Sequence, residues 1–372
     1  MNFSFSDDQL AIKDLVEKMM ADRITDEFWR DFAGSDAPFD TELWSLLAES
    51  GMLGMALPEA CGGSDMGLLE LCLLLQAQGR FLAPVPLLST LMAGALPLAR
   101  FGSEAQQQAY LPKVVSGEAV LTATLGELGK PQTAIAFAAE PQDDGWVLSG
   151  TSDAVPYAQQ AAAILLPARL GDKVALFVVN TDLEGVNLQR QETTNGEPVA
   201  RITLDKLLLG QDALLAQDET VWRWLEQQVL TATAAIQLGV AEEALRRTAE
   251  YTTERQQFKT TLCNFQSVAH RAANAYIDVE AMRSTLWQAA WRLAENLPAT
   301  AEVRTAKWWA SEGGHRVAHT AQHLHGGIGS DIDYPLHRYF LWAKQLEFIG
   351  GGARAQLASL GAELHNDLSE VA

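Results

Sequence analysis

The sequence predicts a mainly α-helical protein with an N-terminal helical domain, a middle β-barrel-like domain and a C-terminal four-helix bundle. Apolar residues recur at helical spacing up to about residue 117 and again beyond Gln211. Between Val120 and Leu209 the period changes to short β-branched runs bounded by glycine, proline or asparagine. We therefore expect domains at residues 1–117, 118–212 and 213–372, with the β domain inserted between the helical ones.

Helix-capping signals mark the N-terminal domain. Ser6 with Gln9 forms a capping-box pattern before the first apolar stripe, and Ser103 is placed to cap a later helix. Residues Leu68 to Gln78 form a strongly apolar run, which is typical of a buried helix. These signals predict a set of helices, one of them buried.

Turn and strand signals fill the middle domain. Asp143-Asp144-Gly145 is a turn signal, and β-branched apolar runs follow at residues 164–166 and 174–179. Residues 202–205 alternate between apolar and polar side chains. The pattern indicates a small β domain.

The C-terminal third contains four long helical segments. They run roughly over residues 218–254, 264–295, 299–324 and 336–368. The short connection Asn296-Leu297-Pro298 implies antiparallel neighbours, so we expect a four-helix bundle.

The composition argues against several classes of protein. A net charge of −20 does not suit a non-specific nucleic-acid surface, which needs a basic face. No uninterrupted apolar run reaches the roughly 18 residues of a membrane helix, and the first 30 residues lack a signal-peptide pattern. Three cysteines with no metal-type spacing fit reduced thiols in a cytoplasmic protein.

Two glycine-rich breaks interrupt the last helical segments, Gly326-Gly327 and Gly350-Gly351-Gly352. Without a Cβ, a glycine pair at a helix end lets backbone N–H groups face an incoming ligand. Ordinary glycine C-caps are the alternative.

Five motifs follow one another along the chain: FSDDQLAIKDLV, LWSLLAESGMLGMALPEACGGSDMG, FGSEAQQQAYLPKVVSGE, AEYTTERQQF with the later FQSVAHRAANAYIDVEAMR, and HLHGGIGSDIDYPLHRYFLWAK. In this order they resemble the motifs of the acyl-CoA dehydrogenase family over almost the whole chain. Each motif alone is a moderate signal, and their order and spacing make the resemblance specific.

The resemblance implies an FAD enzyme that desaturates acyl-CoA thioesters and passes electrons to an acceptor such as an electron-transfer flavoprotein. A carboxylate removes the α-proton while the flavin accepts a hydride from the β-carbon. The resemblance also implies a dimer or tetramer in which FAD spans a subunit interface. One subunit then holds the flavin ring, and the bundle of its neighbour holds the adenine end.

Six residues match the positions that contact a neighbour's FAD. Arg255, Phe258 and Gln266 match one block, and a guanidinium suits a diphosphate because its planar fork binds two oxygens. Gly326 and Gly327 match the loop beside the adenosine diphosphate part, and His323 stands where the family usually has glutamine.

Each of these residues has a structural alternative. Arg255 could form a surface ion pair with Glu254 or Glu250, and Phe258 could be a core aromatic. His315, His319 and His323 recur every four residues, a spacing that could hold a metal. Because no acidic ligand lies among them in sequence and the family needs no metal, we expect a partly exposed helix face and no metal site.

The chain departs from the family where the catalytic base belongs. The usual base position is Gly350, and the alternative position on the first bundle helix is Val229. The arginine common beside that second position is Leu230. Neither glycine nor valine can move a proton, and only Glu226 and Glu347 remain as weak candidates for a displaced base.

The β domain departs as well. Thr124 matches a flavin hydrogen-bond partner, but Ala154-Val155-Pro156 replaces the family's Trp-Ile-Thr, whose indole packs on the flavin. The losses together suggest that this chain's own flavin-ring site is degraded, while its contribution to a neighbour's site is kept.

Three hypotheses follow. The preferred one is a non-catalytic, FAD-completing subunit of a heteromeric acyl-CoA dehydrogenase, paired with a paralogous subunit and acting on a bulky acyl-CoA such as a steroid fragment. The second is a self-sufficient homomeric enzyme whose base is Glu226 or Glu347. The third is a flavin-free acyl-CoA-binding or structural protein.

Overall fold

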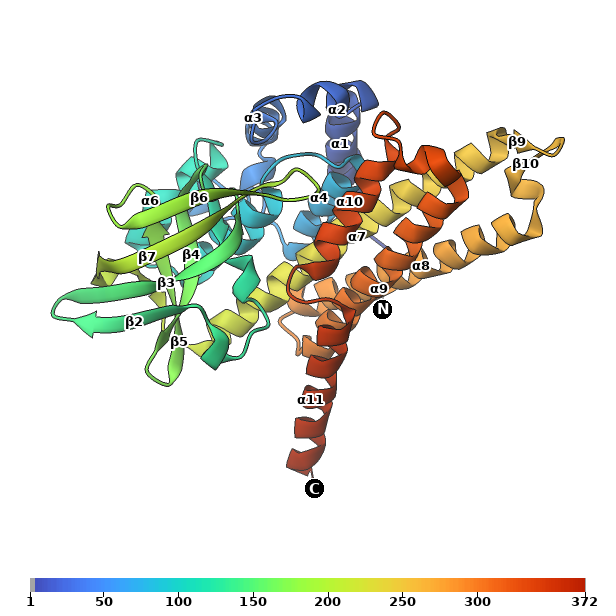
Figure 1. Cartoon of the computed structure of the whole chain (residues 1–372). Coiled ribbons are helices and arrows are strands. Elements are labelled where there is room, and N and C mark those ends of the chain that lie inside the picture. Colours follow the sequence, from blue (N-terminus) through green and yellow to red (C-terminus); the bar gives the residue numbers. More distant parts are fainter. Residues whose placement is uncertain (1–3, 372) are drawn as a thin grey trace. The chain divides into compact units, whose positions relative to one another are not determined.

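The computed structural model describes residues 4–371 (Figure 1). The chain forms two compact units, and each is discontinuous in sequence. The bundle unit contains the residues up to Ser35, Leu68–Ala83 and the residues from Leu230 onward, and the sheet unit contains Asp36–Gly67 and Pro84–Val229. The predicted fold class, mainly α with an inserted β domain, is confirmed. The predicted domain boundaries at residues 117/118 and 212/213 stay a prediction.

The N-terminal part is helical, as predicted. Both capping boxes are present, at Ser6 with Gln9 and at Ser103 with Gln106. The apolar run from Leu68 lies in α4, whose residues Leu71 to Gly79 are buried. The helices are α1 (Asp7–Arg23), α2 (Asp26–Ala33), α3 (Thr41–Glu49), α4 (Leu68–Phe81), the π-type helix η3 (Leu88–Ala95), α5 (Leu96–Phe101) and α6 (Glu104–Val115), with short 3₁₀ turns η1 (Met52–Gly54) and η2 (Glu59–Cys61).

The β domain is one eight-stranded sheet whose strand path runs β6-β7-β3-β2-β4-β5-β8, with β1 paired to β4. The predicted turn at Asp143 joins β2 to β3 with a positive φ of 39°. The strands are β1 (Val120–Ala123), β2 (Phe137–Gln142), β3 (Gly145–Pro156), β4 (Ala161–Leu170), β5 (Lys173–Asn180), β6 (Val186–Glu192), β7 (Pro198–Gly210) and β8 (Leu214–Ala216). The turns η4 (Leu125–Glu127), η5 (Gln132–Ala134) and η6 (Gln211–Ala213) lie between them.

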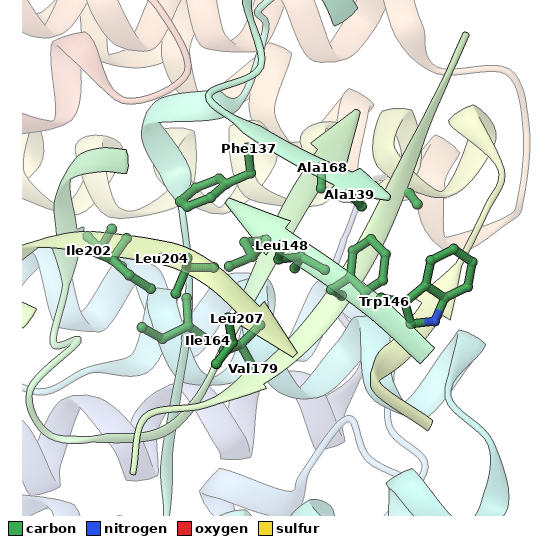
Figure 2. Packing of buried hydrophobic residues seen from close by; sticks show 14 of the residues in the cluster. Phe137, Ala139, Trp146, Leu148, Ile164, Ala168, Val179, Ile202, Leu204 and Leu207 are labelled. Atoms are coloured by element: carbon green, nitrogen blue, oxygen red, sulfur yellow. The ribbon is translucent and has the colours of Figure 1, made fainter. Parts of the chain in front are cut away.

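A hydrophobic core holds this sheet together. Alternate residues of β3 and β7 point to the same side, so Leu148, Ile202 and Leu204 pack with Phe137 and Phe177. All five side chains are at most 2% exposed. Figure 2 shows Phe137, Leu148 and Leu204 among the clustered side chains of neighbouring strands. The sheet is thus a stable platform for the loops at its ends.

Long helices form the C-terminal part, in five pieces rather than four. They are α7 (Glu219–Glu254), α8 (Gln266–Ala294), α9 (Thr300–His325), α10 (Leu336–Phe348) and α11 (Ala353–Val371), with the hairpin β9 (Gln256–Gln257) and β10 (Thr260–Thr261) and the turns η7 (Leu262–Asn264) and η8 (Gly326–Ser330). The expected single segment over residues 336–368 is wrong, because Gly350 and Gly351 adopt positive φ values of 67° and 91°. Such angles lie outside the right-handed helical region, so the chain leaves the helix there.

Helix α4 packs tightly against α7 inside the bundle unit. A Cβ on Gly79 would lie 1.9 Å from the backbone oxygen of Ile236, and one on Gly239 would lie 2.0 Å from that of Gln76. Only glycine permits this close backbone approach. The Gln76 side chain also donates to the Glu242 carboxylate at 2.8 and 3.0 Å. The fold therefore fixes the first bundle helix, which carries several of the candidate site residues.

Among residues 4–371, no helix combines the length and the apolar character that crossing a membrane requires.

Candidate functional site

A two-residue hairpin turn presents Phe258 to solvent. Gln257 pairs with Thr260 across the antiparallel β9–β10 ladder, so Phe258 and Lys259 form the turn. Their φ angles are +52° and +67°, and positive φ at both central residues defines a type I′ turn. The Phe258 side chain is 89% exposed. The alternative of a core aromatic is therefore wrong, and the ring is free to meet a ligand or another chain.

Arg255 lies at the base of this hairpin. Its backbone N–H donates to the oxygen of Tyr251, and its own oxygen accepts from Leu262 N–H, both at 2.9 Å. Its guanidinium is exposed and forms no ion pair within the described part of the chain. Glu250, one of the two expected partners, instead pairs with Arg246. The ion-pair alternative for Arg255 is wrong, and an unpaired cation remains at a fixed backbone position.

The Gly326–Gly327 turn follows the last residue of α9. Gly326 has φ of +66° and ψ of −143°, which strongly favours glycine. A Cβ on Gly327 would meet nothing within 4 Å, and both glycines are exposed. Packing within this chain therefore does not require a glycine at position 327. His323, one turn earlier, is also exposed.

Sequence reasoning missed the contact that joins these two motifs. The imidazole of His325 stacks on the Tyr251 ring, with centroids 4.3 Å apart and planes 19° from parallel. His325 is 4% exposed, and its Nδ1 lies 2.9 Å from the backbone oxygen of Ala321. Its Nε2 is buried and has no hydrogen-bond partner in the part of the chain that the structure describes. The pair couples the last turn of α7, which Arg255 directly follows, to the end of α9 just before Gly326.

Gln266, also predicted from sequence, opens α8 just after the hairpin. Its side chain is exposed, and the helix has no side-chain N-cap at Phe265. Asn264 holds the intervening turn by donating to the hydroxyl oxygens of Thr260 and Thr261 at 2.8 and 3.0 Å. The hairpin and the start of α8 are thus one ordered segment.

Thr124 belongs to the sheet unit and follows β1. Its N–H donates to the backbone oxygen of Leu165 at 3.1 Å, while its hydroxyl is buried and has no hydrogen-bond partner among the described residues. The following loop closes around Glu127, whose carboxylate accepts from Ala136 N–H, Ser152 Oγ and Lys130 Nζ at 3.0, 3.0 and 3.1 Å. The unsatisfied Thr124 hydroxyl is compatible with an outside hydrogen-bond partner.

Neither expected base position can supply a proton acceptor. Val229 is fully buried in α7. At Gly350 an added Cβ would lie 2.3 Å from Leu230 Cδ2, and φ is +67°. Leu230, which stands where the family commonly has arginine, therefore takes up the space that a larger residue at position 350 would need.

Glu347 is held by cations and does not resemble an activated base. Its Oε2 lies 2.5 Å from Lys344 Nζ and 3.2 Å from His315 Nδ1. Burial alone would raise the pKa of Glu347, but the hydrogen bonds and charges of Lys344 and His315 outweigh burial and hold that pKa below its usual value. A lowered pKa weakens a carboxylate as a proton acceptor. The other candidate, Glu226, is a buried side chain on α7.

Three of the four histidines of α9, namely His315, His319 and His323, line one groove. The groove has a volume of about 980 Å³ and is bordered by Arg271, Asn274, Ala275, Ile277, Asp278, His315, Arg316, His319, Thr320 and His323. His315 is half-buried and His319 is exposed, and their rings lie 4.2 Å apart. The structure adds one acidic neighbour that the sequence spacing did not reveal, Glu347 beside His315. Lys344 Nζ also lies 3.0 Å from His315 Nδ1, so this ring nitrogen faces an ammonium group.

Comparisons with known proteins agree with this arrangement. The model of the acyl-CoA dehydrogenase N-terminal domain matches residues 6–118, and that of the C-terminal domain matches residues 231–365. The acyl-CoA dehydrogenase FadE27 of Mycobacterium tuberculosis is 39% identical over 98% of this chain and 99% of its own.

Two solved structures are also similar over nearly the full length. One is the ChsE4–ChsE5 complex from Mycobacterium tuberculosis, with a TM-score of 0.93 and 40% identity over 98% of this chain and 99% of that one. The other is a variant of the Tcur3481–Tcur3483 steroid ACAD, with a TM-score of 0.91 and 43% identity over 97% of this chain and 99% of that one. The chain belongs to the acyl-CoA dehydrogenase family.

Proposed function

We propose that this chain is the non-catalytic, FAD-completing subunit of a heteromeric acyl-CoA dehydrogenase. Its paralogous partner supplies the catalytic carboxylate and the surroundings of the flavin ring. The assembly desaturates an acyl-CoA thioester between its α and β carbons and passes the electrons to an acceptor such as an electron-transfer flavoprotein.

The observation that carries the proposal is an asymmetry between two ends of the bundle unit. At Gly350 the base is missing, and a larger residue there would require the Leu230 side chain to move. At the hairpin, Arg255 and Phe258 are exposed, and Arg255 forms no ion pair within the described residues. A chain that had lost all contact with flavin would have no use for this hairpin, whose turn is strained.

Each retained residue has a role that its surroundings permit. Arg255 binds the diphosphate of the neighbour's FAD, Phe258 packs on the adenine, and Gly327 lets the backbone approach the ligand closely. When bound, FAD supplies the acceptor for the hydride. Gln266 and His323 are exposed side chains that can hydrogen-bond to the same nucleotide.

The substrate class is an extension of this proposal. Two similar structures are a complex of two named chains and a steroid ACAD, so a bulky steroid-derived acyl-CoA is the class we expect. The sequence motifs do not encode the shape of the acyl pocket, so they do not specify the acyl group.

Co-expression with candidate paralogues tests the proposal. The chain expressed alone should contain little flavin and should not oxidise any acyl-CoA. Co-expression with a paralogue that has a carboxylate at a family base position should give a stable mixed assembly that holds flavin and turns over. A yellow, active homomer from this chain alone would contradict the proposal.

The same experiment separates the two alternatives. A homomeric enzyme with a displaced base predicts activity from the chain alone that Glu226→Gln or Glu347→Gln abolishes. The pairing of Glu347 with Lys344 and His315 disfavours that residue. A flavin-free binding protein predicts no uptake of FAD in titration, with or without any paralogue.

A further inference from the structure

Lys259, the second residue of the hairpin turn, has a backbone conformation that is unfavourable for lysine. Its φ of +67° lies in the left-handed region, which glycine adopts freely and a side chain with a Cβ does not. Asparagine and glycine are the residues that type I′ turns prefer. A lysine there destabilises the turn, so a compensating use of its side chain is worth seeking.

The turn itself does not depend on the lysine. The hairpin is closed by the Gln256–Gln257 and Thr260–Thr261 ladder and by the bonds of Asn264 to both threonines. The Lys259 side chain is exposed and makes no hydrogen bond or ion pair within residues 4–371. Local packing therefore gives no reason for lysine at this position.

The charge and the position of Lys259 give a reason for a lysine at this place in the turn. Arg255 and Lys259 are exposed cations that form no ion pair within the described residues, and in sequence they flank the exposed Phe258, in a chain whose net charge is −20. Figure 1 shows this hairpin at the tip of the α7–α8 pair, where another molecule can approach it. An exposed aromatic ring and two cations on one short hairpin match the parts of a nucleotide diphosphate, because the base stacks and the phosphates take the charges.

We propose that Lys259 is a second phosphate-binding residue, which shares with Arg255 the diphosphate of the FAD held by the partner subunit. This inference rests on the proposed function and adds to it a residue that determines the affinity for the dinucleotide. The competing use of Lys259 is an ion pair with a carboxylate on the partner chain, and it predicts a different set of outcomes.

Three substitutions separate the charge of Lys259 from its strain. Lys259→Gln removes the charge and keeps the strain, Lys259→Arg keeps both, and Lys259→Gly removes both. The assembly is purified through a tag on this chain, stripped of flavin and titrated with FAD, and its subunit composition is measured by native mass spectrometry. Arg255→Gln serves as the reference for loss of a phosphate contact.

We expect Lys259→Gln and Lys259→Gly to raise the FAD dissociation constant by about tenfold, the effect of one hydrogen bond to a charged group. Lys259→Arg should stay near the original value, and added salt should weaken binding less in the uncharged variants. Lys259→Gly should also leave the flavin-free chain with a melting temperature at least as high as before, because the turn is relaxed. If Lys259 only stabilised the turn, Lys259→Gly could not raise the stability of the chain and lower its affinity for FAD together.

Three outcomes overturn the inference. If the Lys259 variants bind FAD normally while Arg255→Gln does not, Lys259 has no phosphate role although the proposed function stands. If the Lys259 variants bind FAD normally but lose the partner subunit, the lysine contacts protein. If Arg255→Gln also binds FAD normally, or the assembly takes up no flavin, the proposed function fails as well.

Discussion

The stacked rings of Tyr251 and His325, 4.3 Å apart, join two motifs that are more than seventy residues apart in sequence. Tyr251 lies one turn before Arg255 on α7, and His325 is the residue before Gly326. The stack therefore sets the position of the hairpin relative to the glycine turn within the bundle unit. A ligand that touches both motifs depends on it.

Removing that stack should loosen both motifs. We expect Tyr251→Leu to destabilise the chain by about 1 kcal/mol, since an aromatic pair contributes about that much beyond its buried area. Hydrogen exchange should speed up at both Arg255 and Gly327. Tyr276→Leu is the matched control, because that ring is 59% exposed and should leave stability and exchange unchanged. Equal effects of the two substitutions would contradict a special role for the stack.

Gly327 and Gly350 should respond oppositely to alanine. At Gly327 the new Cβ meets nothing, so Gly327→Ala should leave the melting temperature unchanged and weaken FAD binding to the assembly. At Gly350 the Cβ meets Leu230 at a positive φ, so Gly350→Ala should cost about 1–3 kcal/mol of stability. Thermal unfolding and FAD titration of both variants check this, and a destabilised Gly327→Ala would mean that the glycine serves folding alone.

The clash at Gly350 should be relieved in part by shortening its neighbour. In a Gly350→Ala background, Leu230→Ala removes the atom that the new Cβ meets, at the cost of a cavity. The double variant should therefore be more stable than the sum of the two single changes predicts, by about 1 kcal/mol. A double-mutant cycle from urea unfolding measures the coupling, and additive effects would show that Leu230 does not restrict position 350.

Glu347 should contribute to stability and not to turnover. The pKa of Glu347 is lowered in the folded protein. The ionised carboxylate therefore stabilises the folded state above the usual carboxyl pKa, and this stabilisation is lost as the pH falls through the pKa of Glu347 in the folded protein. Glu347→Gln should lower stability by about 1 kcal/mol at neutral pH, and the difference should shrink in acid. Unfolding at several pH values measures this, and a constant difference, or a lost turnover rate in the assembly, would contradict the assignment.

The sequence predicted the parts of the fold that local signals determine. The capping boxes at Ser6 and Ser103 and the turn at Asp143 lie where expected. The predicted segment over residues 336–368 is wrong, although it contains the glycine run 350–352, of which Gly350 and Gly351 adopt positive φ. Apolar periodicity continues on both sides of the break, and periodicity alone does not record a change of φ.

The sequence motifs select candidate site residues, whose membership of a site stays a prediction, but they do not reveal the contacts of those residues. Motif matching found Arg255 and Phe258, and the structure added that the first is unpaired and the second exposed. The stack of His325 on Tyr251 joins distant segments, so no sequence window contains it. The strain at Lys259 was equally hidden, because a lysine after a phenylalanine is unremarkable until its φ is known.

The central claim is that this chain completes a flavin site whose ring and base belong to its partner. The most direct measurement is the flavin content of the mixed assembly when only this chain carries Arg255→Gln. We predict that the FAD dissociation constant rises about 30-fold or more, with the assembly intact, because a contact between a guanidinium and a diphosphate is lost. Unchanged flavin content and affinity in that assembly would contradict the account.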